Sequence, residues 1–242
     1  MRCMSCMNPL PAYGVGMSDR EIEWVPDASE VRSYYDHMGR KLDILSFYGL
    51  PAVDDLMTNA DFDLAQNIFE LGCGTGRFAE RLFEKYLPPE ARYLGCDASE
   101  VMVGLAQSRL AAHAKRAQIV PADDTMRLPL LDKEADRIVS IFVLDLLGEE
   151  QVAQFFNEAY RSLSDDGKLC FLSLHRGANI PSRIVSALWS ALFAKRPMLL
   201  GGCRPIDLDP FVDRHRWQVM HRRVMAPFLV PAEVWILEKR HA

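Results

Sequence analysis

Residues 68–76 read IFELGCGTG, an apolar run that ends in an acid and leads into three glycines at alternate positions. An amphipathic pattern follows at once, so the segment is predicted to form a strand, a tight turn and the start of a helix. A glycine turn lets the backbone approach a ligand closely, because no Cβ stands in the way. Asp97 follows at the predicted end of the next strand, where an acid can accept hydrogen bonds from the two hydroxyls of a ribose. We therefore expect a nucleoside ligand; a helix N-cap is the alternative role for Asp97.

The rest of the chain alternates short apolar segments with amphipathic helical patterns. This alternation predicts a doubly wound α/β sheet with right-handed crossovers. The last two apolar segments are expected to close the sheet as a hairpin. The predicted strands are residues 66–71, 92–96, 118–120, 138–144, 168–174, 217–225 and 234–237.

The glycine spacing separates two kinds of nucleotide site. A dinucleotide site has the pattern G-x-G-x-x-G, whose third glycine would fall at Arg77. The pattern here is E-x-G-x-G-x-G, which resembles the first motif of the class I S-adenosylmethionine-dependent methyltransferases. Three later segments resemble further motifs of that family in the right order: LGCDAS at 94–99, ADDTMRLPL at 122–130 and LSDDGKL at 163–169. A nicotinamide oxidoreductase is the rival hypothesis, which the position of Arg77 and the segment at 122–130 disfavour.

The resemblance implies a mostly parallel, seven-stranded, doubly wound sheet with a C-terminal antiparallel hairpin strand. It implies one methyltransferase domain over residues 1–242: a flexible arm at 1–20, a helical lid at 30–60 and a Rossmann-like core at 65–242. The expected cofactor is S-adenosylmethionine, with S-adenosylhomocysteine as product. The residues that the resemblance places around the cofactor are Tyr34, Tyr35, Glu70, Gly72, Cys73, Gly74, Gly76, Asp97, Ala98, Asp123, Asp124, Thr125 and Phe142.

Some of these residues have expected roles. Glu70 is placed near the methionine end of the cofactor, and Asp97 on the ribose. Asp124 is expected to accept from the adenine amino group, with Asp123 as a direct competitor. The two tyrosines either cover the cofactor or pack in the core.

Two candidate catalytic residues end the fourth and fifth predicted strands. Asp145 is expected to orient an amine or draw a proton, with a helix cap as an equal alternative. His175 is a candidate general base near neutral pH, although single histidines are often structural. Apolar residues at 182–193 and 197–200 are expected either to wall an acceptor pocket or to form a buried crossover helix.

Charge and composition narrow the class of partner. The net charge of −5 disfavours a nucleic-acid partner, because proteins that bind nucleic acids usually have a basic surface. Residues 141–147 also lack the Asn/Asp-Pro-Pro-Tyr/Phe signature of amino methyltransferases that act on nucleic acids or protein glutamine. We therefore expect a small-molecule acceptor, hydrophobic or amphiphilic, with a non-enzymatic nucleoside-binding regulatory or assembly protein as the alternative.

The cysteine pattern predicts neither disulfides nor a metal site. Six cysteines are scattered along the chain, and no second pair joins Cys3 and Cys6 to complete a zinc site. This usage suits a reducing cytoplasm. Apolar runs of about 18 residues, as a membrane-spanning helix needs, do not occur in the sequence.

Overall fold

The computed structural model describes residues 26–123 and 125–240. The predicted arm at 1–20, with Cys3 and Cys6, and the candidate adenine ligand Asp124 lie outside these residues. The strands are β1 (Asn67–Leu71), β2 (Arg92–Asp97), β3 (Ala117–Pro121), β4 (Ala135–Ile141), β5 (Leu163–Leu174), β6 (Trp217–Met225) and β7 (Ala232–Lys239). The α-helices are α1 (Ala28–Met38), α2 (Leu42–Leu45), α3 (Leu50–Asn59), α4 (Arg77–Lys85), α5 (Glu100–Arg109), α6 (Glu149–Ser162) and α7 (Ile180–Lys195).

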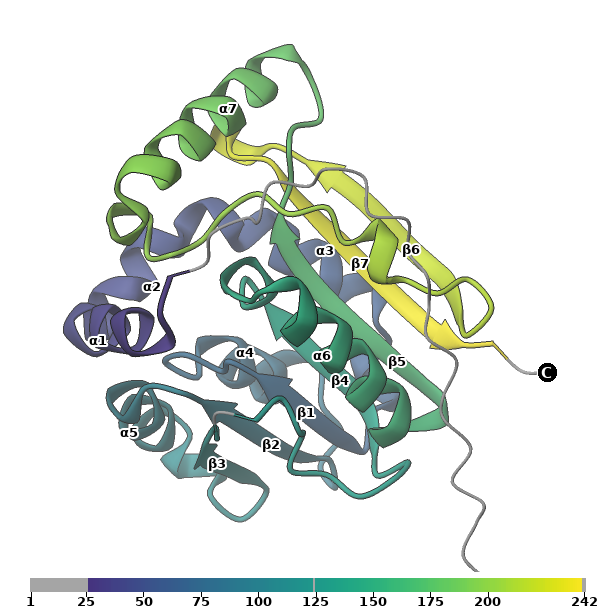
Figure 1. The fold of residues 1–242 in the computed structure, drawn as a ribbon. Coiled ribbons are helices and arrows are strands. Elements are labelled where there is room, and N and C mark those ends of the chain that lie inside the picture. The colour runs from purple at the N-terminus through teal and green to yellow at the C-terminus, as the bar shows by residue number, and fades with distance from the viewer. Residues whose placement is uncertain (1–25, 124, 241–242) are drawn as a thin grey trace, which may run out of the picture.

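The seven strands form one sheet in the order β3-β2-β1-β4-β5-β7-β6 (Figure 1). The first five strands pair in parallel, and β7 pairs antiparallel with both β5 and β6. The predicted mixed sheet and its closing hairpin are therefore confirmed. The order reverses at β1, which lies between β2 and β4, and ligands of such sheets bind beyond the carboxyl ends of the strands at this reversal.

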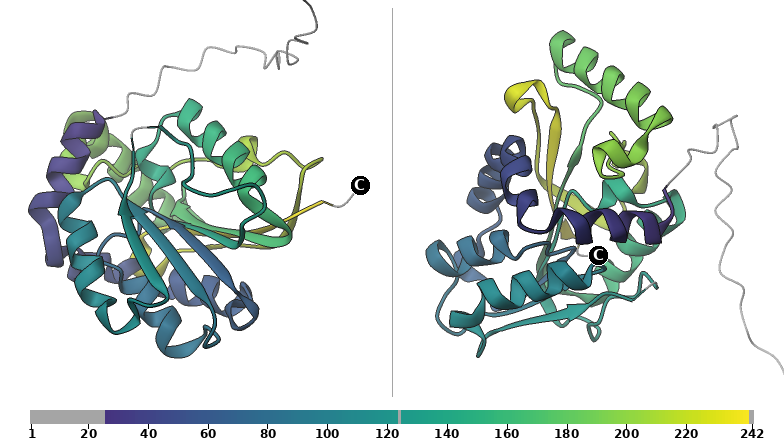
Figure 2. Two further views of the ribbon diagram at one scale, coloured as in Figure 1. Left: turned by 90° about the horizontal axis from the view of Figure 1, so that it is seen from below. Right: turned by 90° about the vertical axis from the view of Figure 1, so that its left-hand side faces the viewer.

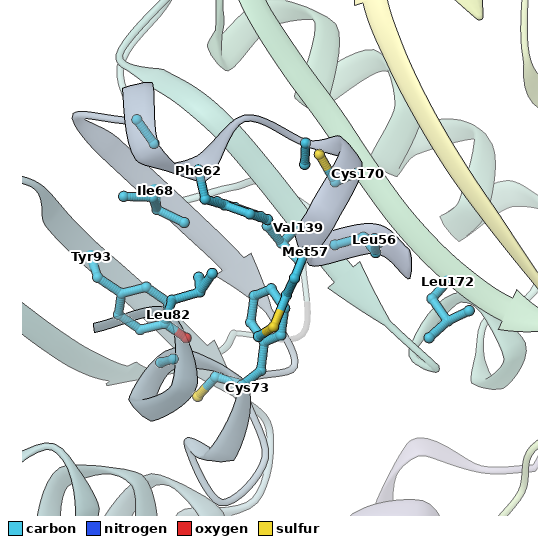
Figure 3. Packing of buried hydrophobic residues seen from close by; sticks show 14 of the residues in the cluster. Leu56, Met57, Phe62, Ile68, Cys73, Leu82, Tyr93, Val139, Cys170 and Leu172 are labelled. Atoms are coloured by element: carbon cyan, nitrogen blue, oxygen red, sulfur yellow. The ribbon is translucent and has the colours of Figure 1, made fainter. Parts of the chain in front are cut away.

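Strand side chains alternate between two apolar layers, because successive residues of a strand point to opposite faces. On one face, α3, α4 and α5 pack over residues such as Ile68, Val139 and Cys170 (Figure 3). On the other face, α6 covers Phe69 and Phe171, together with other large side chains. Burial on both faces explains why the central strands read as continuous apolar runs.

The first two helices, α1 and α2, lie across the end of the sheet rather than on either face (Figures 1 and 2). The apolar pattern at 31–45 predicts one helix, but the chain turns at Gly39, whose φ of 48° belongs to the left-handed region. A 3-10 turn over Gly39–Lys41 then leads into α2. The break lets α1 contact α5, while Leu42 and Asp43 of α2 contact the glycine turn.

The fourth strand ends three residues earlier than its apolar run predicts. Phe142 has a φ of 54°, which turns the backbone out of the strand, and residues Leu144–Leu146 form a 3-10 turn, η5. Leu144 is fully buried in the layer beneath α6. The apolar run therefore continues past the strand because the turn itself is buried. The hydrophobic periodicity and composition of the sequence do not distinguish a buried turn from a strand.

A buried polar contact fixes this turn to the next strand. The carboxylate of Asp145 accepts from the backbone N–H of Leu174 at 3.0 and 3.1 Å, and the Arg204 guanidinium donates to the carbonyls of Asp145 and Leu147 at 2.9 and 2.8 Å. Burial raises the pKa of Asp145 well above its usual range, although the Arg204 charge opposes this. Asp145 therefore joins the end of β4 to the end of β5 and to the chain after α7.

We expect Asp145→Ala to destabilise the protein by about 1–3 kcal/mol, because it leaves the buried N–H of Leu174 without an acceptor. Asp145→Asn keeps an acceptor oxygen and has the shape of the neutral acid, so its stability should stay close to that of the unmutated protein. Urea unfolding followed by circular dichroism measures both. Equal destabilisation by the two substitutions would contradict this role.

Candidate functional site

A cavity of about 890 Å³ opens at the carboxyl ends of β1 to β4, beneath α1 and α2. Its floor is the glycine turn after β1. One wall is the loop after β3, and the other is the aromatic end of β4. The candidate cofactor residues that line it are Tyr35, Glu70, Gly72, Cys73, Gly74, Asp97, Ala98, Asp123, Thr125 and Phe142.

The three glycines of the turn have different roles. All have positive φ, at 71°, 52° and 76° for Gly72, Gly74 and Gly76. A Cβ on Gly72 would lie 2.2 Å from Val143, whereas one on Gly74 would meet only Leu42 of α2, at 3.8 Å. Gly74 thus keeps the cavity floor open, while Gly72 allows the turn to pack on the loop after β4.

Gly76 does not line the cavity, contrary to expectation. A Cβ there would lie 3.0 Å from the backbone of Ala106, so this glycine lets the start of α4 pack closely on α5.

Tyr34, a second candidate cofactor residue, does not line the cavity either. Its ring packs edge-on against Tyr35 and beside Gly201, so of the two tyrosines only Tyr35 faces the cavity.

Asp97 holds the turn in place from the neighbouring strand. One carboxylate oxygen accepts from the N–H of Gly74 at 2.8 Å, and the other accepts from the N–H of Ser99 at 2.9 Å. Each carboxylate oxygen can accept a second hydrogen bond, so both remain available to hydroxyls of a ligand. The N-cap of α5 is instead Ser99, whose hydroxyl accepts from the N–H of Met102.

Glu70 lies at the bottom of the cavity in an apolar setting. The hydroxyl of Tyr93 donates to its carboxylate. Gly95 pairs with Glu70 across the strands, and the Tyr93 ring crosses Gly95 so closely that a Cβ there would lie 2.9 Å from the ring. Burial raises the pKa of Glu70 to about 8, and the nearby charge of Asp97 adds to this. This carboxyl is therefore poised to become charged when a cation enters the cavity.

The loop after β3 lines the cavity with both polar and apolar groups. Asp123 accepts from the backbone N–H and the hydroxyl of Thr125, at 2.9 and 2.7 Å, which fixes the start of the loop. Met126 and Leu128 follow along the cavity wall. A flat ring can therefore lie between polar loop atoms and apolar side chains. This is an arrangement suited to a nucleobase.

A polar cluster that the sequence pattern does not reveal ties α2 to the turn. Asp43 of α2 accepts from the hydroxyl of Thr75 at 2.6 Å and from the guanidinium of Arg109 at 2.5 Å. The guanidinium of Arg77 donates to the Asp43 carbonyl at 2.7 Å. Hydrogen bonds from Thr75 and Arg109, together with the Arg109 charge, lower the pKa of Asp43 despite the opposing effect of burial. Asp43, the glycine-turn residues Thr75 and Arg77, and Arg109 come from three segments that lie more than 30 positions apart, so only the folded chain brings them together.

Aromatic side chains form the side of the cavity away from the turn. Tyr35, Tyr48 and Phe142 line it beside Cys203. The Tyr48 ring packs edge-on against Phe142 with a centroid distance of 5.9 Å, and the Tyr35 hydroxyl lies 3.5 Å from the Cys203 sulfur. Burial raises the pKa of both phenols, so they stay neutral. Of these residues, Tyr48 and Cys203 were not anticipated from the sequence.

The two candidate catalytic residues do not line the cavity. Asp145 points into the protein and serves Leu174, as described above. His175 accepts from the N–H of Gly177 through Nδ1 at 3.1 Å, in the loop before α7. The expectation that both face the acceptor is therefore corrected, because the chain turns away from the cavity at η5 and after β5.

Residues 68–167 match a family model described as "Methyltransferase domain". The chain is 29% identical over 143 residues to a malonyl-[acyl-carrier protein] O-methyltransferase of Hahella chejuensis (strain KCTC 2396), covering 59% of this chain and 49% of the relative. It is 28% identical over 128 residues to the tRNA N(3)-methylcytidine methyltransferase Mettl2 of Drosophila melanogaster, covering 52% and 39% respectively. The matched region thus spans half or less of either relative.

The fold also matches solved structures. The cyclopropane synthase MmaA2 from Mycobacterium tuberculosis superposes with a TM-score of 0.65 at 16% identity, covering 90% of this chain and all of that one. At this identity the likeness concerns the fold alone. Because it covers 90% of this chain, the match extends beyond residues 68–167 on both sides.

The raised pKa of Glu70 predicts a pH-dependent stability. Between pH of about 4.5 and about 8 the folded protein keeps a proton that the unfolded chain releases, so the stability of the ligand-free protein should fall as the pH rises through this window. Glu70→Gln should remove this dependence. Its thermal midpoint should therefore be higher than that of the unmutated protein at pH 8, but not at pH 5. Glu90→Gln, on the surface, is the matched control. Parallel curves for all three proteins would contradict the assignment.

Proposed function

Because the chain belongs to the class I S-adenosylmethionine-dependent methyltransferase family, we propose that it transfers a methyl group from S-adenosylmethionine to an apolar or amphiphilic small molecule. The observation that carries this proposal is the make-up of the 890 Å³ cavity. A glycine turn and a carboxylate lie on one side, and neutral aromatic side chains lie on the other. Cavities of this size bind small molecules with most of their surface buried.

The cavity residues fit the cofactor chemically. In this proposal Asp97 accepts from the ribose hydroxyls, and the open floor at Gly74 lets the nucleoside approach the backbone. Glu70 faces the positively charged methionine end, where a cation favours its ionised form. Asp123 and Thr125 border the base, with Ala98 beside the ribose.

The helices α1 and α2 act as the lid in this proposal. Asp43 fastens α2 to the turn, and the hydroxyl of Ser99 donates to Asp36 of α1 at 2.5 Å. Both contacts reach residues next to the proposed nucleoside site, Thr75 and Ser99. Closing the lid excludes water and aligns the acceptor, which are the main tasks of a protein in this reaction.

The acceptor side supports a nucleophile that needs no dedicated base. The bound cofactor supplies a methyl group that its sulfonium already activates. Histidine is absent among the described residues that line the cavity, and the phenols of Tyr35 and Tyr48 stay neutral. Neutral hydroxyls can orient a polar group of the acceptor, while Phe142 and its neighbours bury an apolar portion. An amphiphilic molecule with a neutral nucleophile, such as an amine, suits this lining.

The proposal is tested by S-adenosylhomocysteine release from the purified chain, with S-adenosylmethionine and a panel of amphiphilic amines, acids and phenols. Bulk tRNA is included because one relative is named for methylation of tRNA. We expect turnover with an amphiphile and none with tRNA. Turnover with tRNA alone would overturn the proposed acceptor class. Tight S-adenosylhomocysteine binding without turnover on any substrate would favour a regulatory nucleoside-binding protein.

We expect Asp97→Ala to weaken S-adenosylhomocysteine binding by about a hundredfold or more. The substitution removes two charge-assisted hydrogen bonds to the ribose, each about 1.5–3 kcal/mol, and every 1.4 kcal/mol is about tenfold in affinity. Calorimetry measures the affinity, and a thermal melt shows that the fold persists. Tyr34→Phe, outside the cavity, is the matched control and should bind normally. Unchanged affinity in Asp97→Ala would contradict the assignment of Asp97 to the ribose.

A further inference from the structure

The outer face of α7 exposes aliphatic side chains in a regular stripe. Ile180, Ile184, Leu188 and Leu192 follow one another at four-residue spacing and are 75%, 58%, 66% and 40% exposed. Residues four apart lie on one face of a helix. This corrects both expectations for the segment, since the helix neither walls the cavity nor lies buried.

The inner face of α7 fixes this orientation. Its buried residues are Ser182, Ser186 and Phe193, so none of the four aliphatic residues of the stripe is among those that face the protein. Trp189 donates from its indole N–H to the carbonyl of Cys203 at 2.9 Å, and its ring packs against Tyr48. The helix therefore cannot turn its stripe inward without breaking these contacts.

Further apolar side chains extend the stripe at the same end of the molecule. Leu199 is 60% exposed in the 3-10 turn η6 (Pro197–Leu200), which packs beside the end of α7. Phe228 is 68% exposed in η8 (Pro227–Leu229), which contacts α7. Figures 1 and 2 show α7 and the turn between β6 and β7 projecting together from one end. An exposed apolar face of this kind marks an interaction surface.

The only charged side chains in the segment that carries the stripe are positive. Residues 176–206 contain five basic residues and no acid, in a chain whose net charge is −5. Four of the five are exposed at the surface: Arg176, Arg183, Lys195 and Arg196. Within residues 26–123 and 125–240 none of these four makes an ion pair.

We propose that α7 binds the surface of a bilayer containing anionic lipid, lying in the interface with its aliphatic stripe inserted and its basic residues on the headgroups. Amphipathic helices with an apolar face and basic flanks bind membranes in this way, through buried apolar area and attraction to anionic lipid. The proposal does not depend on methyl transfer. It places Tyr48 and Cys203, at the aromatic side of the cavity, directly behind the membrane-bound helix.

A second copy of the chain fits this face less well. Pairing two α7 helices across a two-fold axis would bring together two sets of basic residues with no acid in the segment to balance them. Like charges brought together at an interface cost affinity. An anionic bilayer satisfies both the aliphatic stripe and the positive charge.

The test is co-sedimentation of the full chain with vesicles. We expect binding to vesicles of phosphatidylcholine with phosphatidylglycerol, and much weaker binding to phosphatidylcholine alone. The double substitution Ile184→Glu with Leu188→Glu should lower the partition coefficient roughly tenfold or more. Arg183→Gln with Lys195→Gln should lower it roughly tenfold and reduce its salt dependence.

The matched control is Leu64→Glu with Leu131→Glu, which changes two exposed leucines that belong to neither α7, η6 nor η8. It should bind like the unmutated protein, and circular dichroism confirms that each variant is folded. Failure of the unmutated chain to bind anionic vesicles, or equal loss of binding in the control, would overturn the proposal. Sedimentation velocity shows whether the chain forms a dimer. A dimer that Ile184→Glu with Leu188→Glu dissociates, in a protein that does not bind vesicles, would identify this face as a self-interface and overturn the membrane assignment.

Discussion

The contact between the Asp97 carboxylate and the N–H of Gly74 organises the whole site. It joins the end of β2 to the turn after β1 and holds Gly74 in a left-handed conformation that leaves the floor of the cavity open. It also places a desolvated carboxylate within the cavity, where burial raises its pKa. Because each oxygen keeps a free acceptor position, the same group that shapes the turn can bind a ligand.

The cap over the cavity depends on this turn. Thr75, next to Gly74, donates to Asp43 of α2, and Arg109 of α5 binds both residues. Polar contacts thus hold α2 to the side of the cavity where we propose that the nucleoside binds, while Tyr35 and Tyr48 line the opposite side. Cofactor and acceptor binding are coupled through this cluster in our account, since a shift of the turn moves α2 and with it the lining around Tyr48.

The sequence predicted the sheet well because the apolar runs of its central strands are bounded by glycine, proline and capping residues. The hairpin closes the sheet as expected, and Ser99, which directly follows the second predicted strand region, caps α5. The predicted boundaries were wrong in two places. One is the end of β4, where burial continues beyond the strand to Leu144, and the other is Gly39, where a single glycine breaks the predicted helix.

The site was predictable where a local motif carries it and not elsewhere. Residues 70–74 and Asp97 line the cavity as the motif predicts. Asp145 and His175 were placed by strand order alone, and that order does not say which way the chain turns after a strand. The Asp43 cluster and Cys203 come from distant segments, so no periodicity or spacing points to them. The sequence showed that the α7 segment is apolar, but not which face of the helix points to solvent. That orientation depends on Ser182, Ser186 and Trp189, which face the protein.

Hydrogen–deuterium exchange of the full chain with and without S-adenosylhomocysteine tests the central claim most directly. Our account predicts slower exchange at residues 72–76 and 97–99, and also in α1 and α2, because the turn and the cap close on one ligand. Protection confined to the turn would contradict the coupling of the cap to the nucleoside site. Protection at neither segment, with the ligand bound, would contradict the assignment of the cavity itself.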